Sequence, residues 1–283
     1  MPHRPLALLL ALAPLACRPA APAEPAAAAP EPTPPPAPAE PAPDATPPAP
    51  GPEDSSARWR AIVADPARPD DERALDPGRK PAELLAFLDL KPGMKVADVG
   101  AGLGYTTFLL AQAVGPEGRV YAQNSRRVRE RFAEPAFSER LKTPGFANVT
   151  RVDQEFEQPV PKDIKDLDLV INFIFYHDTF WMKVDNKQMN RAIFDGLRSG
   201  GRYVIVDHSA RAGAGSKDSQ TLHRVEESLV RSEVEAAGFK LEGSAEFLRN
   251  PDDPRDWNAS PRAAEAAGKR GQADRFILKF VKP

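Results

Sequence analysis

The chain has 283 residues, with 38 Lys and Arg against 40 Asp and Glu, so its formal net charge is −2. The basic residues are scattered along it, which argues against the concentrated positive footprint of a nucleic-acid-binding protein. A single cysteine excludes a disulfide within the chain. Composition therefore leaves room for one well-filled domain whose expected partners do not include nucleic acid.

The first seventeen residues, 1–17, have the pattern of a bacterial export signal. Arg4 supplies a basic start, and the apolar run over 6–15 is too short to span a bilayer. Cys17 stands where the lipidated cysteine of a lipobox would, although Pro14 replaces the usual leucine. We expect a periplasmic protein or a lipoprotein that meets a membrane only through its lipid. Cleavage without lipid, or a cytoplasmic protein with a misassigned start codon, are the alternatives.

Residues 18–54 are almost wholly Ala, Pro and Glu and hold nearly half of the 32 prolines. Proline fixes φ and donates no hydrogen bond, so this stretch predicts an extended, disordered tether. A recognition segment for proline-binding modules is the alternative. The folded domain is expected over 55–283.

The folded part begins with helical patterns. Residues 59–79 predict a short helix followed by an ordered loop, and 81–90 predict a helix that begins with a proline. Leu84, Leu85 and Leu88 have helical spacing within it.

Strands then alternate with helices. The expected strands cover residues 95–99, 119–122, 148–152, 167–175, 202–206, 239–247 and 275–281. The expected helices cover 105–114, 126–141, a stretch ended by Ser199-Gly200-Gly201, and 218–237. The run over 167–175 lacks polar alternation, as in a strand covered on both faces. The whole pattern predicts an α/β fold with a parallel sheet between helices.

Ligands of such sheets bind at the carboxyl ends of the strands. Five clusters follow expected strands and are therefore the candidate site: 98–104, Gln123-Asn124, Asp153, Tyr176-His177-Asp178 and Asp207-His208.

The first cluster is a glycine-rich turn, with Gly100, Gly102 and Gly104 after Asp98. Glycine lets a ligand lie against bare backbone, and the helix that follows points free N–H groups at it. A dinucleotide fingerprint would place its third glycine one residue later, at Tyr105. The spacing therefore argues against an NAD-dependent oxidoreductase.

This turn resembles motif I of the class I S-adenosylmethionine (SAM)-dependent methyltransferases. Together with Tyr176-His177-Asp178, the run from Asp207 to Ala210 and the Thr221–Arg224 segment, it is similar to a bacterial family of predicted exported class I methyltransferases, from about Arg73 to the C-terminus. The resemblance implies a three-layer Rossmann-like fold with a seven-stranded, mostly parallel sheet. Its last strand would be antiparallel and inserted beside the fifth. SAM is the implied cofactor, and the N-terminal piece would lie over its cleft.

By position, the resemblance places Asp98 and the three glycines at the methionine and ribose end of SAM. Gln123 and Asn124 stand where most class I enzymes hold the ribose with an acidic residue, so cofactor binding is expected to be weaker or compensated elsewhere. Asp153 matches the residue that meets the adenine amino group; a solvated loop acid is the alternative.

Methyl transfer needs a base only where the nucleophile keeps its proton. His177 is the first candidate, oriented by Asp178, and His208 is the second. Tyr176 and Trp181 would form an aromatic wall for the substrate. Structural histidines at the strand ends are the alternative.

Asp178, Asp207 and His208 resemble in placement the metal ligands of catechol-type O-methyltransferases. No tight ligand spacing supports a metal, so none is assigned. His223 is interpreted as part of a solvated helix face. The polar segment 249–257 could be a lid or a surface connection.

The sequence thus predicts a SAM-dependent methyltransferase that acts on an oxygen or nitrogen nucleophile of an unidentified small molecule. The alternative is an exported, non-catalytic small-molecule-binding module on the same fold. The sequence does not indicate an oligomeric state.

Overall fold

The computed structural model describes residues 52–283. The expected export signal, Cys17 and the tether up to residue 51 lie outside the described residues, so export and lipidation stay predictions. Within the described part, no helix combines the length and apolar character needed to cross a membrane.

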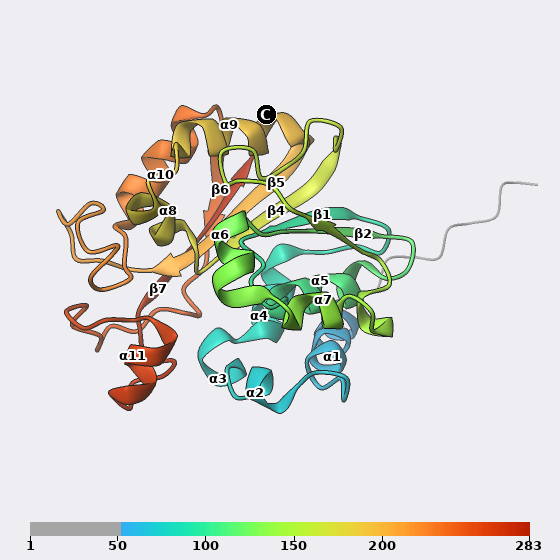
Figure 1. The fold of residues 1–283 in the computed structure, drawn as a ribbon, viewed down its shortest axis with the longest axis horizontal. Helices are drawn as coiled ribbons and strands as arrows, with labels where there is room; N and C mark the ends of the chain where they lie inside the picture. The colour runs from blue at the N-terminus through green and yellow to red at the C-terminus, as the bar shows by residue number, and fades with distance from the viewer. Residues whose placement is uncertain (1–51) are drawn as a thin grey trace, which may run out of the picture. The chain divides into compact units, whose positions relative to one another are not determined.

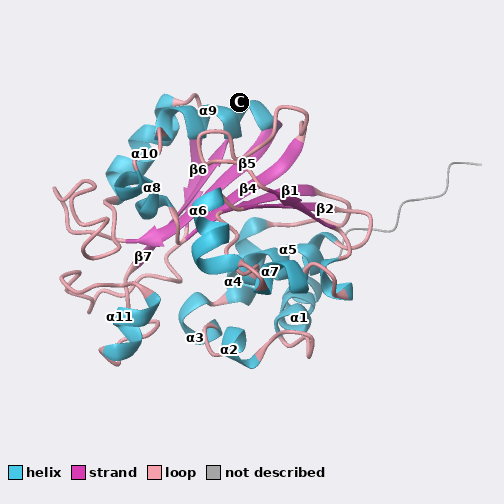
Figure 2. Cartoon of the chain, viewed as in Figure 1, coloured by secondary structure: helices cyan, strands magenta, loops and turns pink. Residues whose placement is uncertain are grey.

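A seven-stranded sheet forms the centre of the fold (Figures 1 and 2). Its strands are β1 (Lys95–Val99), β2 (Arg119–Gln123), β3 (Val149–Val152), β4 (Leu167–Phe173), β5 (Leu197–His208), β6 (Lys240–Ser244) and β7 (Arg275–Val281). They lie in the order β3-β2-β1-β4-β5-β7-β6. β7 runs antiparallel between β5 and β6, and the pairs among the first five strands are parallel. The expected fold class is therefore confirmed, including the inserted last strand.

Helices cover both faces of this sheet (Figure 1). One face packs against α1 (Pro52–Val63), α4 (Pro81–Leu88) and α5 (Tyr105–Val114), with Leu84, Leu85 and Leu109 buried in its core. The other face packs against α9 (Asn186–Gly196) and α10 (Glu227–Ala236) through Met189 and Val234. β4 lies in the middle with six of its seven residues buried, as its unbroken apolar run predicts.

The remaining helical segments are short. They are α2 (Asp70–Arg73), α3 (Asp76–Arg79), α6 (Arg126–Val128), the π-helical turn η1 (Arg129–Ala133), α7 (Ala136–Arg140), the 3₁₀ turn η2 (Pro144–Phe146), α8 (Tyr176–Met182) and α11 (Pro261–Ala266). The single helix expected over 126–141 is wrong, because the chain is extended at Glu134 and Pro135 follows it. Proline lacks the N–H that a continuing helix needs.

The helix expected over 218–237 is also wrong in its first half. Val225 forms a bridge with Ser209, donating its N–H to the carbonyl of His208 and accepting from Ala210 N. Since that backbone pairs with the end of β5, the helix begins only at Glu227. This bridge brings residues 223–225 to the carboxyl edge of the sheet.

Other boundaries also differ from expectation, and the strand expected over 239–247 covers only Lys240–Ser244. Ser199-Gly200-Gly201 does not end a helix: α9 ends at Gly196, and Leu197 already pairs with Leu167 in the sheet. The strand over 167–175 is shorter, because Ile174 takes a left-handed φ of 57° and α8 begins at Tyr176.

Candidate functional site

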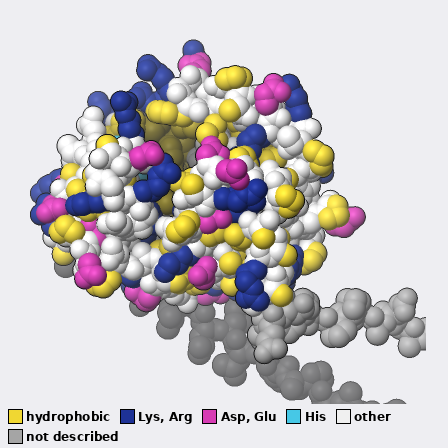
Figure 3. Space-filling model, turned by 90° about the horizontal axis from the view of Figure 1, so that it is seen from below, with side chains coloured by type: hydrophobic (Ala, Val, Ile, Leu, Met, Phe, Trp, Pro, Cys, Tyr) yellow, Lys and Arg dark blue, Asp and Glu magenta, His cyan; other side chains and the backbone are white. Residues whose placement is uncertain are grey.

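A cavity of about 820 Å³ opens at the carboxyl edge of the sheet. Figure 3 shows a hollow with mainly hydrophobic walls and with basic and acidic side chains at its rim. The lining comes from the turn after β1, from α2 and α3, from the residues after β4 and β5, and from the start of α11. The N-terminal piece therefore lines the cavity, as the resemblance implied.

The turn over residues 100–104, called the glycine loop below, lines one wall of the cavity. Gly100 has φ 74°, and a Cβ there would lie 2.8 Å from the ring of Phe175. Gly102 has φ 56°, and a Cβ would meet nothing within 4 Å, so its bare backbone faces open space. Both positions need glycine for their conformation, and Gly102 is where a ligand can approach the backbone.

Gln123 and Asn124 are buried and hold the glycine loop. Gln123 Oε1 accepts from Gly100 N at 3.0 Å, and its Nε2 donates to the carbonyl of Gln154. Asn124 Oδ1 accepts from Gly102 N at 2.8 Å, and its Nδ2 donates to Gly102 O at 3.0 Å. Neither side chain lines the cavity. The amides expected at the ribose are thus occupied in fixing the loop.

Asp98 lies in β1, two residues before the glycine loop, and its side chain lines the cavity. It is 1% exposed and accepts a hydrogen bond from Thr107 Oγ1 at 2.7 Å. Burial raises the pKa of its carboxyl to about 6, against a smaller lowering by the Thr107 bonds.

Asp153 is not brought to this cavity. Its carboxylate pairs with Arg151 at 2.8 Å and with Arg129 at 3.3 Å, on a partly exposed part of the surface. These surroundings are those of the alternative, a solvated loop acid.

Four side chains that line the cavity lie close together: His177, Asp178, His208 and His223, called the histidine cluster below. His177 Nε2 lies 3.2 Å from Asp178 Oδ1 and 3.2 Å from His223 Nδ1. His223 Nδ1 lies 3.4 Å from Asp178 Oδ1. The ring centroids of His177 and His208 are 5.7 Å apart.

Asp207, at the end of β5, positions His177. One carboxylate oxygen accepts from the backbone N–H of His177, and the other lies 2.7 Å from its Nδ1. The first N–H groups of a helix have no partner within it, so Asp207 also anchors the start of α8. It is fully buried and does not line the cavity.

The pKa values of His177 and Asp178 are shifted in opposite directions. Burial alone would lower the pKa of His177, but Asp207 and Asp178 together raise it to about 10. Burial likewise would raise the pKa of Asp178, yet the charge of His177 and bonds from His177, His223 and Trp181 hold it well below its usual range. While it is protonated, His177 has no free lone pair, so it can act as a base or as a ligand only after Nε2 has lost its proton.

His208 has the opposite character. Burial first, then the charges of Arg275, His177 and Arg224, hold its pKa well below that of a free imidazole. Its Nδ1 lies 3.1 Å from the carbonyl oxygen of His223, which can only accept. The hydrogen is therefore on Nδ1, and Nε2 keeps a lone pair.

The interpretation of His223 as part of a solvated helix face is wrong. It lies in a loop with φ 52°, and its side chain joins the histidine cluster. The bridge between Val225 and Ser209 puts it there, which local periodicity does not reveal. The Thr221–Arg224 motif was the only signal in the sequence.

The aromatic wall is formed differently from expectation. Tyr176 is buried away from the cavity and donates its hydroxyl to Glu233 at 2.8 Å. Trp181 does line the cavity, with Nε1 donating to Asp178 Oδ1 at 2.6 Å. Further aromatic surfaces come from Tyr105, Phe132, Phe173 and Phe175.

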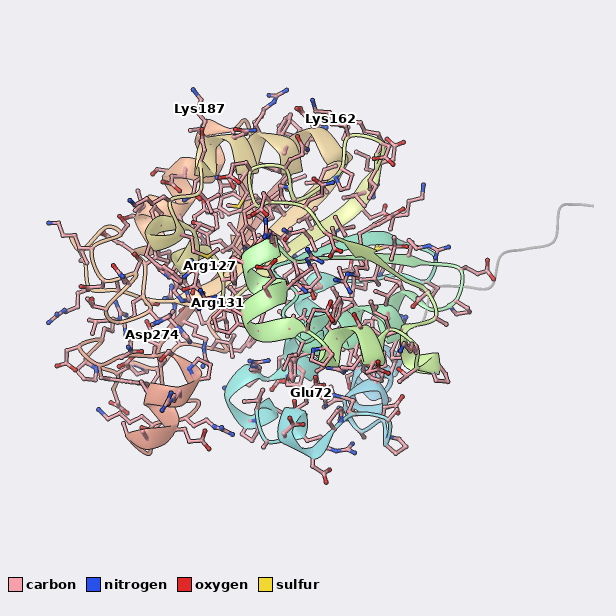
Figure 4. The ribbon with its side chains drawn as sticks, in the orientation of Figure 1. Glu72, Arg127, Arg131, Lys162, Lys187 and Asp274 are labelled. Atoms are coloured by element: carbon pink, nitrogen blue, oxygen red, sulfur yellow. The ribbon has the colours of Figure 1, made fainter. Side chains whose placement is uncertain are left out.

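Arginines also line the cavity, and the sequence analysis did not single them out. Arg79 lies over the ring of Tyr105 at 4.2 Å, and Arg127 lies over that of Trp181 at 5.0 Å. Arg140 pairs with Glu72 of α2. Figure 4 labels Arg127 on α6 and Glu72 on α2. Their spacing in the sequence is irregular, so only the fold gathers them.

The polar segment 249–257 does not line the cavity. Its Asp253 forms a fully buried ion pair with Arg224 at 2.8 Å and accepts from Trp257 Nε1 at 2.7 Å. The segment therefore packs as a surface connection in this structure, while Ser260, Pro261 and Arg262, just beyond it, do reach the cavity.

Comparison with known proteins agrees with this architecture. Residues 90–247, more than half of the chain, match the model of a family described as methyltransferase domain. A protein-L-isoaspartate O-methyltransferase of Aeropyrum pernix is 49% identical over 69 residues, which cover 24% of this chain and 25% of that protein. The chain spans between a fifth and a third of the length of the curated relatives it matches.

Among solved structures, a SAM-dependent methyltransferase from Aquifex aeolicus aligns with a TM-score of 0.52 and 19% identity, covering 81% of this chain and 98% of that one. The [4+2]-cyclase SpnF aligns with a TM-score of 0.51 and 14% identity, covering 73% of this chain and 85% of its own. At these identities the likeness establishes the fold and not the reaction.

Proposed function

Since the chain belongs to the methyltransferase-domain family, we propose that it is an enzyme that transfers the methyl group of SAM to an oxygen or nitrogen atom of a small-molecule acceptor. One observation carries this proposal. The glycine loop and the histidine cluster both line one cavity of about 820 Å³, so a cofactor at the loop and an acceptor at the cluster would share the same space.

The glycine loop suits the cofactor. Gly102 offers exposed backbone, and Asp98 offers a buried carboxylate for the positive groups of SAM. In this proposal Gln123 and Asn124 position the loop through Gly100 and Gly102 rather than binding the ribose themselves. An in-line displacement depends chiefly on such positioning.

The histidine cluster suits the acceptor. His208 lines the cavity and keeps a lone pair on Nε2, so it replaces His177 as the proposed proton acceptor. Arg127, which lies over the ring of Trp181, adds positive charge nearby, and this favours an acceptor with a negative group. The partial relatives are named O-methyltransferases, which supports oxygen over nitrogen as the methylated atom.

Calorimetric titration with SAM and with S-adenosylhomocysteine tests the cofactor. We expect both to bind, and Gly102→Val to abolish binding because its side chain would project into the cavity. Gly93→Val is the matched control: Gly93 also has a positive φ (84°) and open space around it, but it lies outside the cavity. Failure of both compounds to bind the parent protein would contradict the proposal.

Turnover is then tested with a panel of small carboxylates, phenols and amines, by mass-spectrometric detection of S-adenosylhomocysteine. We expect release with at least one oxygen acceptor, and loss of release in His208→Ala with cofactor binding retained. Binding without release across the whole panel would favour the non-catalytic module instead.

A further inference from the structure

We propose that His177, Asp178 and His223 form a binding site for one divalent transition-metal ion, of which zinc fits best, opening onto the cavity. The site is assembled from α8 and from the loop that precedes α10. All three residues line the cavity. The sequence shows no tight ligand spacing, and His223 reaches the other two residues only in the folded chain.

The first argument is the triangle formed by the three donor atoms. His177 Nε2, Asp178 Oδ1 and His223 Nδ1 are separated by 3.2, 3.2 and 3.4 Å. Tetrahedral zinc, with nitrogen and oxygen ligands at about 2.0 to 2.1 Å, requires ligands about 3.3 to 3.4 Å apart. The donor atoms thus match three corners of a tetrahedron without moving more than about a tenth or two of an ångström in separation.

The second argument is the support behind His177. Its Nδ1 lies 2.7 Å from the buried carboxylate of Asp207, which leaves Nε2 aimed at the triangle. A metal-binding histidine characteristically donates its other ring N–H to a carboxylate in this way, and the bond fixes the tautomer and the ring. Trp181 Nε1 donates to Asp178 Oδ1 at 2.6 Å and so holds the second ligand in place.

The third argument is access. The side chains of Asp178 and His223 are 18% and 26% exposed, so the triangle is open on the cavity side. Three protein ligands with a free fourth position are typical of catalytic zinc sites, whereas structural sites are closed by four. Two carboxylates around His177 add negative charge that favours a cation there.

A second group of nearby donors, His177, Asp207 and His208, is less suitable. The contact between His177 Nδ1 and Asp207 Oδ1, at 2.7 Å, is a hydrogen bond and too short for two ligands of one zinc ion. The oxygens of Asp207 also accept the backbone N–H groups of His177 and His208. The set with Asp207 and His208 that resembles catechol-type enzymes is therefore not the one the geometry favours.

The role of the ion rests on the proposed function, although the site does not. An acceptor hydroxyl would take the fourth position and pass its proton to His208 Nε2. Its oxygen would then form a bond to the methyl carbon while the carbon–sulfur bond breaks and its electron pair stays on sulfur, giving S-adenosylhomocysteine. The metal ion would stabilise the negative oxygen and fix its place in the cavity.

Direct metal binding tests the site independently of any methyl transfer. The full chain, stripped with a chelator, is titrated with Zn²⁺ by calorimetry and with Co²⁺ by visible absorption at fixed pH. We expect one ion per chain and the intense cobalt bands of four-coordination. His223→Ala and Asp178→Asn should each weaken binding by at least about tenfold, and Asp207→Asn by about 10- to 100-fold.

His208→Ala is the matched control, because it removes a neighbouring histidine that is not a ligand. Binding that is unchanged in His223→Ala, or that is lost equally in His208→Ala, would overturn the site. Absence of binding to the parent chain would do so too. S-adenosylhomocysteine titration of the same preparations keeps the two proposals apart, since cofactor binding needs neither His223 nor the ion.

Discussion

At the scale of single residues, the site depends on polar side chains whose partners are fixed by burial. Asp98 is a carboxylate with one side-chain hydrogen bond, from Thr107, in surroundings that disfavour its charge. Both the oxygen and the nitrogen of the Asn124 side-chain amide form hydrogen bonds with the backbone of Gly102. Asp98→Asn and Asn124→Asp each keep the size and shape of the side chain. They therefore change its charge and hydrogen bonding without changing its packing.

Asp98→Asn should stabilise the folded protein at neutral and higher pH. The folded-state pKa of about 6 lies above the reference 3.8, so ionisation costs stability as pH rises from about 4 to about 6, and the full cost is present above that. Removing the charge should raise the free energy of unfolding at pH 8 by up to about 3 kcal/mol. Urea unfolding at pH 8 and pH 4 checks this, and an equal gain at both values would contradict it.

The same substitution should weaken SAM binding, because the carboxylate is proposed to face the positive end of the cofactor. A more stable protein with poorer SAM affinity is thus the expected signature of Asp98. Calorimetric titration measures it, with the parent chain as reference. Unchanged affinity would remove Asp98 from the proposed cofactor site while leaving its effect on stability intact.

Asn124→Asp should destabilise the protein, although acidic residues are usual at this position in the class it resembles. A carboxylate can still accept from Gly102 N, but it cannot donate to Gly102 O and would face that oxygen with like polarity. Leaving a buried acceptor unsatisfied costs about 1 to 3 kcal/mol. Urea unfolding at pH 8 measures the loss, and a stability equal to the parent's would show that the ribose position is open to an acid.

At the scale of elements, the loop over residues 223–225 contributes more contacts to the site and its surroundings than a helix there would. Val225 pairs with the end of β5, Arg224 reaches Asp253, and His223 turns into the cavity. Three consecutive residues therefore tie the sheet, the 249–257 segment and the histidine cluster together. A helix in their place would break all three contacts.

Asp253→Ala should cost the fold about 3 to 5 kcal/mol, because Arg224 would be left as a buried charge without its partner. Trp257→Phe removes one hydrogen bond to the same carboxylate, keeps an aromatic ring against Arg224, and should cost about 1 kcal/mol. Denaturant unfolding of both variants gives the comparison. If the two losses are alike, the ion pair is not what holds the segment.

At the scale of the whole molecule, the cavity is assembled from parts far apart in the sequence. α2 and α3 precede the sheet, the glycine loop follows β1, and residues 260–262 come after β6. A ligand that touches all of them should order all of them. The central sheet and its loops line part of the cavity, and α2, α3 and residues 260–262 line another part.

Saturating S-adenosylhomocysteine should slow amide exchange in the glycine loop and in α3 together. At a hundred times its Kd the ligand should add about 2.7 kcal/mol to the free energy of unfolding. Hydrogen exchange read by mass spectrometry tests the first point, with β6 at the far edge of the sheet as the unaffected reference. Protection limited to the glycine loop would mean that α3 is not part of the cofactor site.

The fold was largely predictable from local patterns. The strand over 95–99, the helix over 105–114 and the last strand over 275–281 have the predicted bounds. Apolar runs, turn residues and three glycines specify them, because burial on both faces and left-handed turns constrain nearby residues alone. The candidate histidines were also located correctly at the strand ends.

Tertiary structure alone decided which polar groups meet. A hydrogen bond depends on what lies within about 3 Å in space, and that neighbour can come from any part of the chain. So it was the packed sheet that turned Gln123 and Asn124 toward the glycine loop, buried Tyr176, and brought His223 beside His177. The sequence by itself determined the order of the strands and which polar clusters follow them, because apolar runs and turn residues act locally; only the folded chain decided which of those side chains share one space.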